Sequence, residues 1–287
     1  MASPESAKSL LVVGFGYLGQ RAAHQALKAG WKVYATSRRI EKKAEMESAG
    51  VEFIHFDITR PEDLDHLPAS SAWIWSPAFD RRQGLPVHEV IVGGLKRALN
   101  QAPVLPQKVI YTSTTSVYHQ SGGEWVDETS TTEPRTDSGK ANLEAEQFLT
   151  SWAVEQDRQA MVLRLSGLYG PGRWIRRASI QAGEPIACEP DTWLNLVHID
   201  DAASACLAAL ETKESGTYCI TDNQPILRRE FYETSARLLQ APAPSVTPPT
   251  SPDFAGNKRV SNQKAREKLA WKPRFGDVNS GLLDCFA

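Results

Sequence analysis

The chain has no long apolar run and no excess of charge of either sign. Its longest apolar run near the start, Leu10 to Val13, is far shorter than the ~20 residues of a membrane span. It is also too short for the apolar core of a signal peptide. The 32 Lys and Arg residues nearly balance 34 Asp and Glu residues, which gives a net charge of -2. A nucleic-acid binder needs a basic face, so we expect neither nucleic acid nor membrane as a partner.

Cysteine and metal-ligand patterns are also sparse. The four cysteines form no Cys-x-x-Cys pair, and the six histidines show no paired metal-ligand spacing. The sequence therefore predicts no disulfide framework and no metal site. We interpret the cysteines as reduced core residues and expect a cytoplasmic protein. The chain also lacks the Gly-x-Ser-x-Gly elbow of hydrolases and the phosphate loop of nucleoside-triphosphate enzymes.

The residues that are present suit a folded globular protein, because 41% are apolar and 23% are charged. Strand-like and helix-like segments alternate in the N-terminal half. Strands are predicted at 10–13, 32–36, 52–56, 72–75, 108–112 and 160–165, and helices at 17–29, 40–49, 87–100 and 137–156. Each parallel crossover needs a covering element, so this alternation predicts an α/β fold with a doubly wound parallel sheet.

The pattern becomes less regular after about residue 170. The predicted elements there are a strand at 194–199, an alanine-rich helix at 201–211, a proline-rich loop at 241–252 and a short helix at 261–269. At ~150 residues per domain, 287 residues correspond to about two domains or one large one. We predict a first domain over residues 1–170 and a small mixed α/β C-terminal substrate-binding region over 171–287, interleaved with the first.

A glycine-rich turn follows the first predicted strand and precedes a predicted helix. It reads Gly14-Phe15-Gly16-Tyr17-Leu18-Gly19, and this context favours dinucleotide binding. Gly14 permits the tight turn, Gly16 lets the backbone approach a pyrophosphate, and Gly19 lets the helix pack on the sheet. Free N–H groups at the helix start would face the anion. An ordinary glycine-rich turn is the alternative.

The end of the second strand bears on which dinucleotide is bound. An NAD site has a carboxylate about 20 residues after the glycines, but the chain reads Thr36-Ser37-Arg38-Arg39, with no acid before Glu41. Two arginines at a helix start oppose the helix dipole, and a 2′-phosphate would supply the missing negative charge. One such charge-assisted contact contributes ~1.5–3 kcal/mol. We predict NADP as the cofactor, with NAD as the alternative if these arginines are merely solvated.

Further cofactor contacts are expected at the carboxyl ends of the other strands, where ligands bind in such sheets. Asp57 lies where an acid would contact the adenine, and a helix cap is its alternative role. The remaining predicted contacts at these strand ends are Ile58, Ser76, Pro77, Ala78 and Thr112.

Four further segments carry a resemblance to a known family. They are 109–118 (VIYTSTTSVY), 164–172 (RLSGLYGPG), 197–201 (VHIDD) and 264–273 (KAREKLAWKP). In this order they resemble the extended short-chain dehydrogenase/reductases of the NAD(P)-dependent epimerase/dehydratase family. With the glycine string and the segment TDSGK, they are most similar to a small YeeZ-like branch.

The resemblance covers nearly the whole chain. It implies a Rossmann-type fold and an NAD(P)-dependent oxidoreductase or epimerase/dehydratase-like activity. The substrate would be a small carbonyl or hydroxyl compound, sugar-derived ones included. Family dimers pack the helices at about 87–100 and 137–156 against their mates, so the resemblance also implies a homodimer.

Two positions depart from the family pattern. Val13 stands where extended members usually have the first glycine of the turn, and Thr136 stands at the tyrosine of the catalytic Tyr-x-x-x-Lys pair. No tyrosine of the chain has a lysine four residues on. An alkyl alcohol is far too weak an acid to replace a phenol. A general acid/base contributes typically 10²–10⁴-fold, so its loss raises the barrier by roughly 3–5.5 kcal/mol.

Three residues are the candidates for catalysis. Thr114 aligns with the family's Ser/Thr that hydrogen-bonds the reacting oxygen, with strand-end capping as its alternative. Lys140 matches the family lysine that holds the nicotinamide ribose, and it is an acid in its own right if burial lowers its pKa. A surface lysine is its alternative. Tyr118 aligns with a tyrosine that shapes the family's substrate pocket, and it is a candidate substitute acid.

The substrate side is predicted from a cluster after the Gly-Pro-Gly turn. Arg173, Arg176 and Arg177 surround Trp174 there, a composition suited to an anionic or sugar substrate. A surface patch is the alternative. His198 either lines the cleft or packs behind it.

Two functions of different classes follow. One is an NADP(H)-dependent enzyme with a non-standard proton donor. The other, indicated by Thr136, is a non-catalytic NADP(H)-binding sensor or scaffold.

Overall fold

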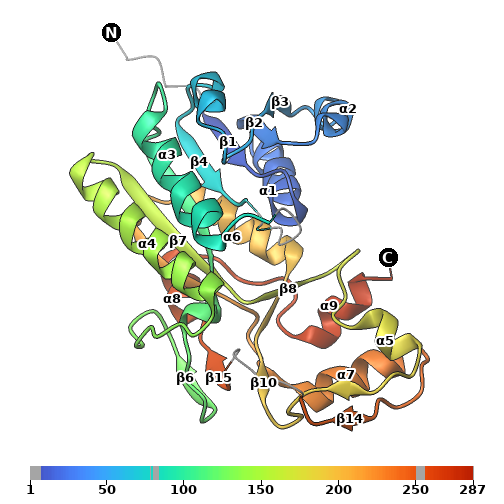
Figure 1. Cartoon of the computed structure of the whole chain (residues 1–287). Coiled ribbons are helices and arrows are strands. Elements are labelled where there is room, and N and C mark those ends of the chain that lie inside the picture. Colours follow the sequence, from blue (N-terminus) through green and yellow to red (C-terminus); the bar gives the residue numbers. More distant parts are fainter. Residues whose placement is uncertain (1–7, 78, 80–83, 250–255, 287) are drawn as a thin grey trace. The chain divides into compact units, whose positions relative to one another are not determined.

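The computed structural model describes residues 8–77, 79, 84–249 and 256–286 (Figure 1). A seven-stranded sheet forms its centre, in the order β12-β7-β5-β4-β1-β2-β3. These strands are β1 (Ser9–Val13), β2 (Lys32–Ser37), β3 (Glu52–His55), β4 (Ala72–Trp75), β5 (Lys108–Thr114), β7 (Gln159–Leu165) and β12 (Gly216–Ile220). The pairs β1–β2, β1–β4, β2–β3 and β4–β5 are parallel. The predicted doubly wound parallel α/β sheet is thereby confirmed.

Helices cover both faces of this sheet. They are α1 (Tyr17–Lys28), α2 (Lys43–Ser48), α3 (Gly94–Gln101), α4 (Asp137–Glu155) and α6 (Ile199–Glu211). Alternate side chains of β1 face opposite ways. Leu11 and Val13 pack into a core with Leu95 of α3 and Leu149 of α4, whereas Val12 lies against Gly19 of α1. The fully buried run of β1 reflects its position between two layers of helices.

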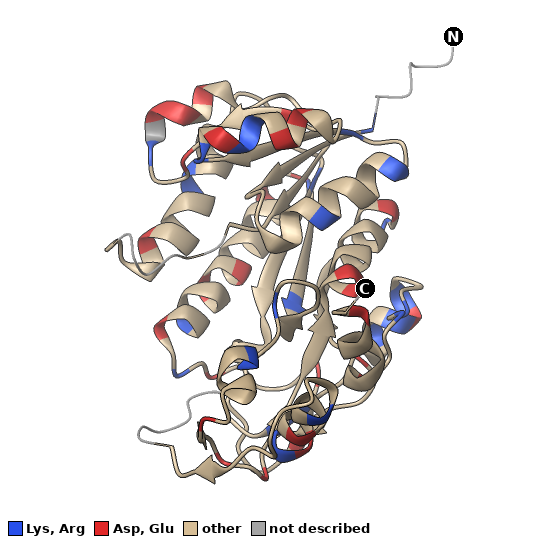
Figure 2. Ribbon diagram, turned by 90° about the vertical axis from the view of Figure 1, so that its right-hand side faces the viewer, with Lys and Arg blue, Asp and Glu red and all other residues tan. Residues whose placement is uncertain are grey.

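Smaller elements complete the fold. The remaining helices are α5 (Arg177–Gln181), α7 (Arg228–Leu238), α8 (Gln263–Lys268) and α9 (Val278–Asp284). The remaining strands pair as β6 (Glu124–Val126) with β15 (Lys258–Val260), β8 (Gly167–Tyr169) with β11 (Leu196–His198), β9 (Ile186–Ala187) with β14 (Val246–Thr247), and β10 (Trp193–Leu194) with β13 (Ile226–Leu227). Charges of both signs are interspersed over the helices (Figure 2). Within the described ranges, no helix is both long and apolar enough to span a membrane.

Three predicted elements differ in detail. The helix predicted at 40–49 is a short 3₁₀ turn, Ile40–Lys42, followed by α2. The helix predicted at 87–100 begins with a π-helical turn, Glu89–Gly93, before α3. The strand predicted at 194–199 is two strands, β10 and β11, with different partners. Backbone hydrogen bonding sets such boundaries, and side-chain periodicity does not report it.

The chain divides into two compact units. The first unit contains Met1–Ser113, Asp137–Leu163 and Ala203–Thr217, and the second contains Thr114–Thr136, Arg164–Ala202 and Tyr218–Ala287. The two units interleave along the chain, and the predicted boundary at residue 170 stays a prediction. The chain leaves the first unit at the end of β5, returns at α4, leaves again within β7, returns within α6 and leaves a last time within β12. Such crossings depend on which distant segments pack together, which the order of elements along the chain does not reveal.

In the second unit, hydrogen bonds join two of the segments that carry the family resemblance, 197–201 and 264–273. Asp201, in the first turn of α6, accepts hydrogen bonds from the backbone N–H groups of Arg274 and Phe275, at 2.7 and 2.9 Å. The indole Nε1 of Trp271 donates to the Asp201 carbonyl oxygen at 3.2 Å. Burial raises the pKa of the Asp201 carboxyl, and these backbone donors oppose the shift. Asp201 thus fastens the segment 271–275 to the start of α6.

Candidate functional site

The glycine-rich turn joins β1 to α1 within the first unit. Gly14 has a φ of +99°, a conformation that other residues rarely adopt, and its N–H donates to Thr36 Oγ1 at 3.0 Å. The Phe15 N–H donates to the Thr36 carbonyl oxygen at 2.9 Å. The phenyl ring of Phe15 and the side chain of Leu18 are buried, so the turn is anchored to the core and to the end of β2.

The three glycines of the turn differ in what surrounds them. A Cβ on Gly14 would lie 2.6 Å from the Ser76 carbonyl oxygen, and one on Gly19 would lie 2.1 Å from the Gly14 carbonyl oxygen. A Cβ on Gly16 would meet no other described atom within 4 Å. Packing among the described residues therefore requires glycine at 14 and 19 but not at 16. The open space beside Gly16 fits the close approach of a pyrophosphate to the backbone.

The first turn of α1 adds a favourable environment for an anion. Gly16 is the N-cap residue, and no side chain of the described part of the molecule caps the helix there. The first turn also contains no acidic residue. The Gly16 N–H donates to the Gly14 carbonyl oxygen at 2.8 Å, and the positive end of the helix dipole favours an anion at the helix start. The residues present fit the phosphates of a dinucleotide.

At the end of β2, the structure exposes both arginines. Arg38 and Arg39 are exposed, and Ser37 is half-buried with its hydroxyl accepting a hydrogen bond from the Arg39 N–H at 3.1 Å. The Arg38 carbonyl oxygen lies 3.2 Å from His55 Nε2, which ties the strand end to β3. The two arginines follow β2 at the sequence position where an NAD site has its carboxylate. The predicted NADP preference stays a prediction.

The residues predicted to contact the cofactor at the ends of β3, β4 and β5 take part in hydrogen bonds and close packing within the protein. Asp57 Oδ1 accepts from the Thr59 N–H at 2.9 Å and from its hydroxyl at 2.7 Å, so it closes a turn. The Ile58 carbonyl oxygen accepts from Arg97 Nη2 at 3.0 Å, and the Thr112 hydroxyl donates to the Trp75 carbonyl oxygen at 3.1 Å. The Ser76 N–H donates to the Val13 carbonyl oxygen, and Pro77 lies close to Gly14. Ala78 lies outside the described residues.

Buried polar contacts fix α4, the helix that carries Lys140, on β5. The Tyr111 hydroxyl donates to Asn142 Oδ1 at 2.7 Å, and the Ser113 hydroxyl donates to the Glu146 carboxylate. Lys140 lies in the first turn of α4 and is exposed. An acid role for its ammonium group required burial, and this exposed position does not provide it. A role in holding a ribose needs no burial and stays a prediction.

The other two catalytic candidates belong to the second unit and have internal contacts. Thr114 Oγ1 accepts a hydrogen bond from the Ser116 N–H at 3.1 Å, which is the strand-end cap weighed as its alternative role. Its own hydroxyl proton is not used by that bond. Tyr118 is almost fully buried, and its hydroxyl accepts from Arg164 Nη1 at 2.7 Å and lies 3.3 Å from Cys219 Sγ.

The environment of Tyr118 opposes the predicted role of proton donor. Burial raises the pKa of its phenol above the ordinary value, and the nearby Arg164 guanidinium only partly offsets this. A buried phenol of raised pKa is a poor acid, and its hydroxyl is already engaged. Tyr118 is better described as a core residue that binds Arg164.

We expect Tyr118→Phe to lower the free energy of unfolding by about 1.5–3 kcal/mol, because Arg164 then loses a hydrogen-bond acceptor inside the core. Chemical denaturation followed by tryptophan fluorescence measures this change. Tyr34→Phe, at a half-buried position of β2, is the matched control and should change stability little. A Tyr118→Phe protein of unchanged stability would contradict the structural role.

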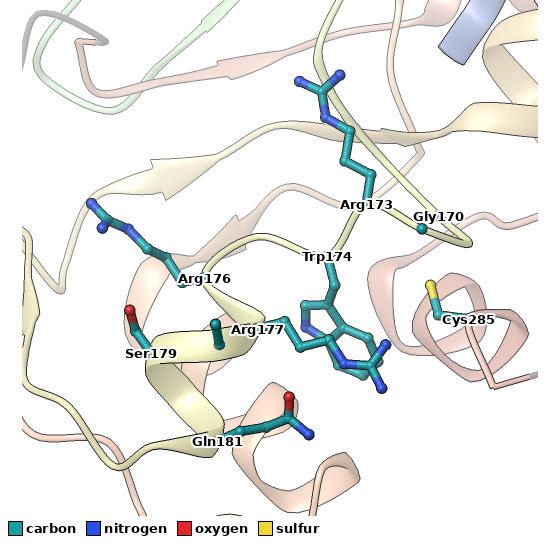
Figure 3. A pocket seen from close by; sticks show the side chains of 10 residues that line it. Gly170, Arg173, Trp174, Arg176, Arg177, Ser179, Gln181 and Cys285 are labelled. Atoms are coloured by element: carbon teal, nitrogen blue, oxygen red, sulfur yellow. The ribbon is translucent and has the colours of Figure 1, made fainter.

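The predicted substrate residues are only partly brought together. Arg173, Trp174 and Arg177 line one pocket of about 460 Å³ in the second unit (Figure 3). Arg176 lines it too, and so does Cys285, which was expected to be a core cysteine. No local pattern connects the residue after α9 to the Gly-Pro-Gly turn, so the sequence carried no signal for this contact. Cys188, Cys206 and Cys219 are buried as expected.

His198 is buried in the core and is not among the described residues that line this pocket. Its ring is fully buried, 4.1 Å from the Phe275 ring and 5.4 Å from the Tyr169 ring. Nδ1 accepts the Asp200 N–H at 3.3 Å, and Nε2 lies 3.5 Å from Asp284 Oδ2. Of the two alternatives for His198, these contacts match the packing role and not the lining of a cleft.

Comparison with known proteins agrees with this architecture. The profile of the NAD dependent epimerase/dehydratase family matches residues 10–220. Protein YeeZ of Escherichia coli K12 is 28% identical over 279 residues, which cover 94% of this chain and 97% of YeeZ. The 3-diazoavenalumate denitrifying reductase of a Streptomyces species is 29% identical over 158 residues, 50% of this chain and 52% of the reductase.

A solved structure shows the same fold. The UDP-glucose 4-epimerase of Thermus thermophilus, in complex with NAD, superposes with a TM-score of 0.81 at 21% identity, covering 97% of this chain and 98% of the epimerase. Since the family profile covers well over half of the residues, the chain belongs to the NAD-dependent epimerase/dehydratase family.

Proposed function

We propose that this chain is an NADP(H)-dependent oxidoreductase or epimerase/dehydratase-like enzyme for a small carbonyl or hydroxyl substrate, with a proton donor other than the family's tyrosine. The observation that carries the proposal is the turn at 14–19, where a Cβ on Gly16 would meet no other described atom within 4 Å and no described side chain caps the helix. Family membership supports nicotinamide chemistry. The similarity to the Streptomyces reductase supports redox activity in particular.

The first unit provides separate groups for the parts of such a cofactor. The N–H groups at the start of α1 would bind the pyrophosphate. Arg38, with Arg39 beside it, would bind a 2′-phosphate through paired N–H donors. Lys140 would hold the nicotinamide ribose. When bound, the cofactor supplies or accepts the hydride, and these residues orient it.

The proton has to come from a group other than residue 136. The Thr136 hydroxyl is too weak an acid, and Tyr118 is enclosed in the core. Lys140 is exposed, so the burial that would make its ammonium group a catalytic acid is absent. Thr114 keeps a hydroxyl proton that can hydrogen-bond a reacting oxygen. We assign orientation of the reacting oxygen to Thr114 and positioning of the ribose to Lys140, so the proton donor is a group outside the three predicted catalytic residues.

Parallel titrations with NADPH and NADH, followed by nicotinamide fluorescence, test the cofactor assignment. We expect NADPH to bind more tightly, and Arg38→Ala to reduce the preference roughly 10- to 150-fold through loss of one charge-assisted contact. Arg229→Ala, an exposed arginine of the second unit, is the control and should leave both affinities unchanged. Preference for NADH would overturn the NADP assignment, and binding of neither would overturn the dinucleotide site.

One observation favours a second function. Thr136 removes the family's proton donor, which a non-catalytic NADP(H)-binding sensor or scaffold does not need. Such a protein would bind NADPH tightly and leave its redox state unchanged with every carbonyl compound offered. It would instead change its binding to a partner when NADPH is added. Turnover with any substrate excludes this function.

A further inference from the structure

A tight turn follows β3 at the position where the adenine of the cofactor is predicted to bind. The Arg60 N–H donates to the Asp57 carbonyl oxygen at 2.9 Å, and Asp57 Oδ1 accepts from the N–H and the hydroxyl of Thr59. The Asp57 N–H donates to Asp63 Oδ2 at 2.8 Å. Within the described part of the chain, no hydrogen bond uses the Ile58 N–H or Asp57 Oδ2. The turn therefore presents one donor and one acceptor from consecutive residues.

This donor and acceptor are complementary to one edge of an adenine ring. Adenine has its N6 amino donor next to the N1 acceptor, so a carboxylate oxygen and a neighbouring N–H bind both. Hypoxanthine has a carbonyl oxygen and an N–H at the same two positions, and it therefore matches neither group. Because hydrogen bonds are directional, the match requires that the backbone at residue 58 keeps one orientation.

Arg97 of α3 holds this backbone by its carbonyl group. Its Nη2 donates to the Ile58 carbonyl oxygen at 3.0 Å, although 39 residues separate the two in the chain. Its Nη1 pairs with the carboxylate of Glu89. The planar guanidinium fixes the angle between its donors, so the contact with Glu89 orients the contact with Ile58.

The chain before α3 is shaped around these contacts. Glu89 begins a π-helical turn, Glu89–Gly93, and turns of this kind are rare and frequent at functional sites. A Cβ on Gly93 would lie 2.9 Å from Glu89 Oε2, and a Cβ on Gly94 would lie 3.2 Å from Ile58 Cδ1. Gly93 thus leaves room for the Glu89 side chain to fold back over the helix, and Gly94 lets Ile58 pack closely against it.

The arrangement leaves one donor of Arg97 without a partner. The side chain is half-buried, and its Nε is buried with no hydrogen-bond partner among the described residues. A buried donor without a partner costs stability, so its presence needs an explanation. A role in positioning a ligand-binding turn provides one.

We propose that Arg97, oriented by Glu89, is a positioning residue that makes the turn at 57–60 selective for adenine over hypoxanthine. Arg97 fixes Ile58 through its carbonyl oxygen, and the Ile58 N–H and the Asp57 carboxylate then bind the edge of the base. The inference rests on the proposed dinucleotide function and adds to it the residues that set base selectivity. All of these residues belong to the first unit.

Fluorescence titrations with NADPH and with its hypoxanthine analogue, reduced nicotinamide hypoxanthine dinucleotide phosphate, test this role. The two ligands differ only at purine positions 6 and 1, so the ratio of their Kd values reports base selection alone. We expect the native chain to prefer NADPH roughly tenfold or more, the contribution of the hydrogen bonds at these positions. In Arg97→Gln and in Glu89→Ala, the affinity for NADPH should fall to that of the analogue, so that the ratio approaches one.

A control variant and a stability measurement distinguish positioning from a general structural role. Arg158→Gln removes another arginine that donates to a backbone carbonyl oxygen in the first unit, and it should keep the native ratio. A structural role would lower the melting temperature or weaken both ligands equally, with the ratio unchanged. The native ratio in both Arg97→Gln and Glu89→Ala would therefore overturn the inference. Glu89 has a half-exposed side chain, so Glu89→Ala provides the test if Arg97→Gln does not fold.

The same titrations separate this inference from the proposed function. If the native chain binds neither ligand, the dinucleotide site itself is wrong. If it binds both tightly and with equal affinity, the dinucleotide site stands and only the base selectivity is wrong. The ratio can also be measured with NADH and its hypoxanthine analogue, so it does not depend on whether Arg38 binds a 2′-phosphate.

Discussion

Gly16→Ala is expected to weaken NADPH binding by roughly 10- to 150-fold, the equivalent of one charge-assisted hydrogen bond of ~1.5–3 kcal/mol, while the melting temperature stays unchanged. The added methyl group meets no other described atom within 4 Å, and the backbone of Gly16, with a φ of -97°, suits alanine. It would instead occupy the space that a pyrophosphate needs next to the backbone. Fluorescence titration and thermal denaturation measure the two quantities on one preparation.

Gly19→Ala is the contrasting control for this experiment. Its Cβ would lie 2.1 Å from the Gly14 carbonyl oxygen and 3.1 Å from Val12 Cγ1, so α1 would have to move away from β1. We expect loss of stability together with loss of binding. If Gly16→Ala bound NADPH as tightly as the native chain, the open space at Gly16 would not be the cofactor site.

Thr136→Tyr is expected to raise NADPH-dependent reduction of small aldehydes and ketones by about 10²–10⁴-fold, the usual contribution of a general acid. Residue 136 directly precedes α4, and Lys140 follows one helical turn later on the same face. A phenol at this position restores the family's Tyr-x-x-x-Lys spacing on a helix that buried contacts already fix to β5. Steady-state NADPH oxidation, followed by the loss of nicotinamide absorbance, measures the gain.

Two controls show what a gain in this experiment means. Thr136→Phe adds the ring without the hydroxyl and should give no gain. Thr136→Tyr combined with Lys140→Ala should lose most of it, since the lysine positions the ribose. If Thr136→Tyr binds NADPH normally but remains inactive, the site lacks more than a proton donor. That result would favour the non-catalytic NADP(H)-binding function.

Features that depend on neighbouring residues were predictable from the sequence. One such feature is the unit formed by β1, the glycine-rich turn and α1, because apolar periodicity and the conformational needs of glycine are local properties. The same holds for the exposed arginines after β2, which follow a strand at a fixed spacing from the turn. The absence of the family's tyrosine at 136 also needs no structure to be seen. Together these features define the fold and the predicted cofactor-binding part of the candidate site.

Features that depend on long-range packing were decided by the tertiary structure. Tyr118 looked like a free phenol near Thr114, but Cys219, 101 residues away, and Arg164 enclose its hydroxyl. Packing of the C-terminal helix likewise brings Cys285 to the arginines at the start of α5.

The physical reason is the difference between composition and environment. The sequence by itself determined which chemical groups the chain carries and which elements they lie on, since short-range sterics and periodicity set both. Whether a hydroxyl is an acid or a core contact depends on burial and on the charges packed around it. Those are properties of residues far apart in the chain, and only the tertiary structure brought them together.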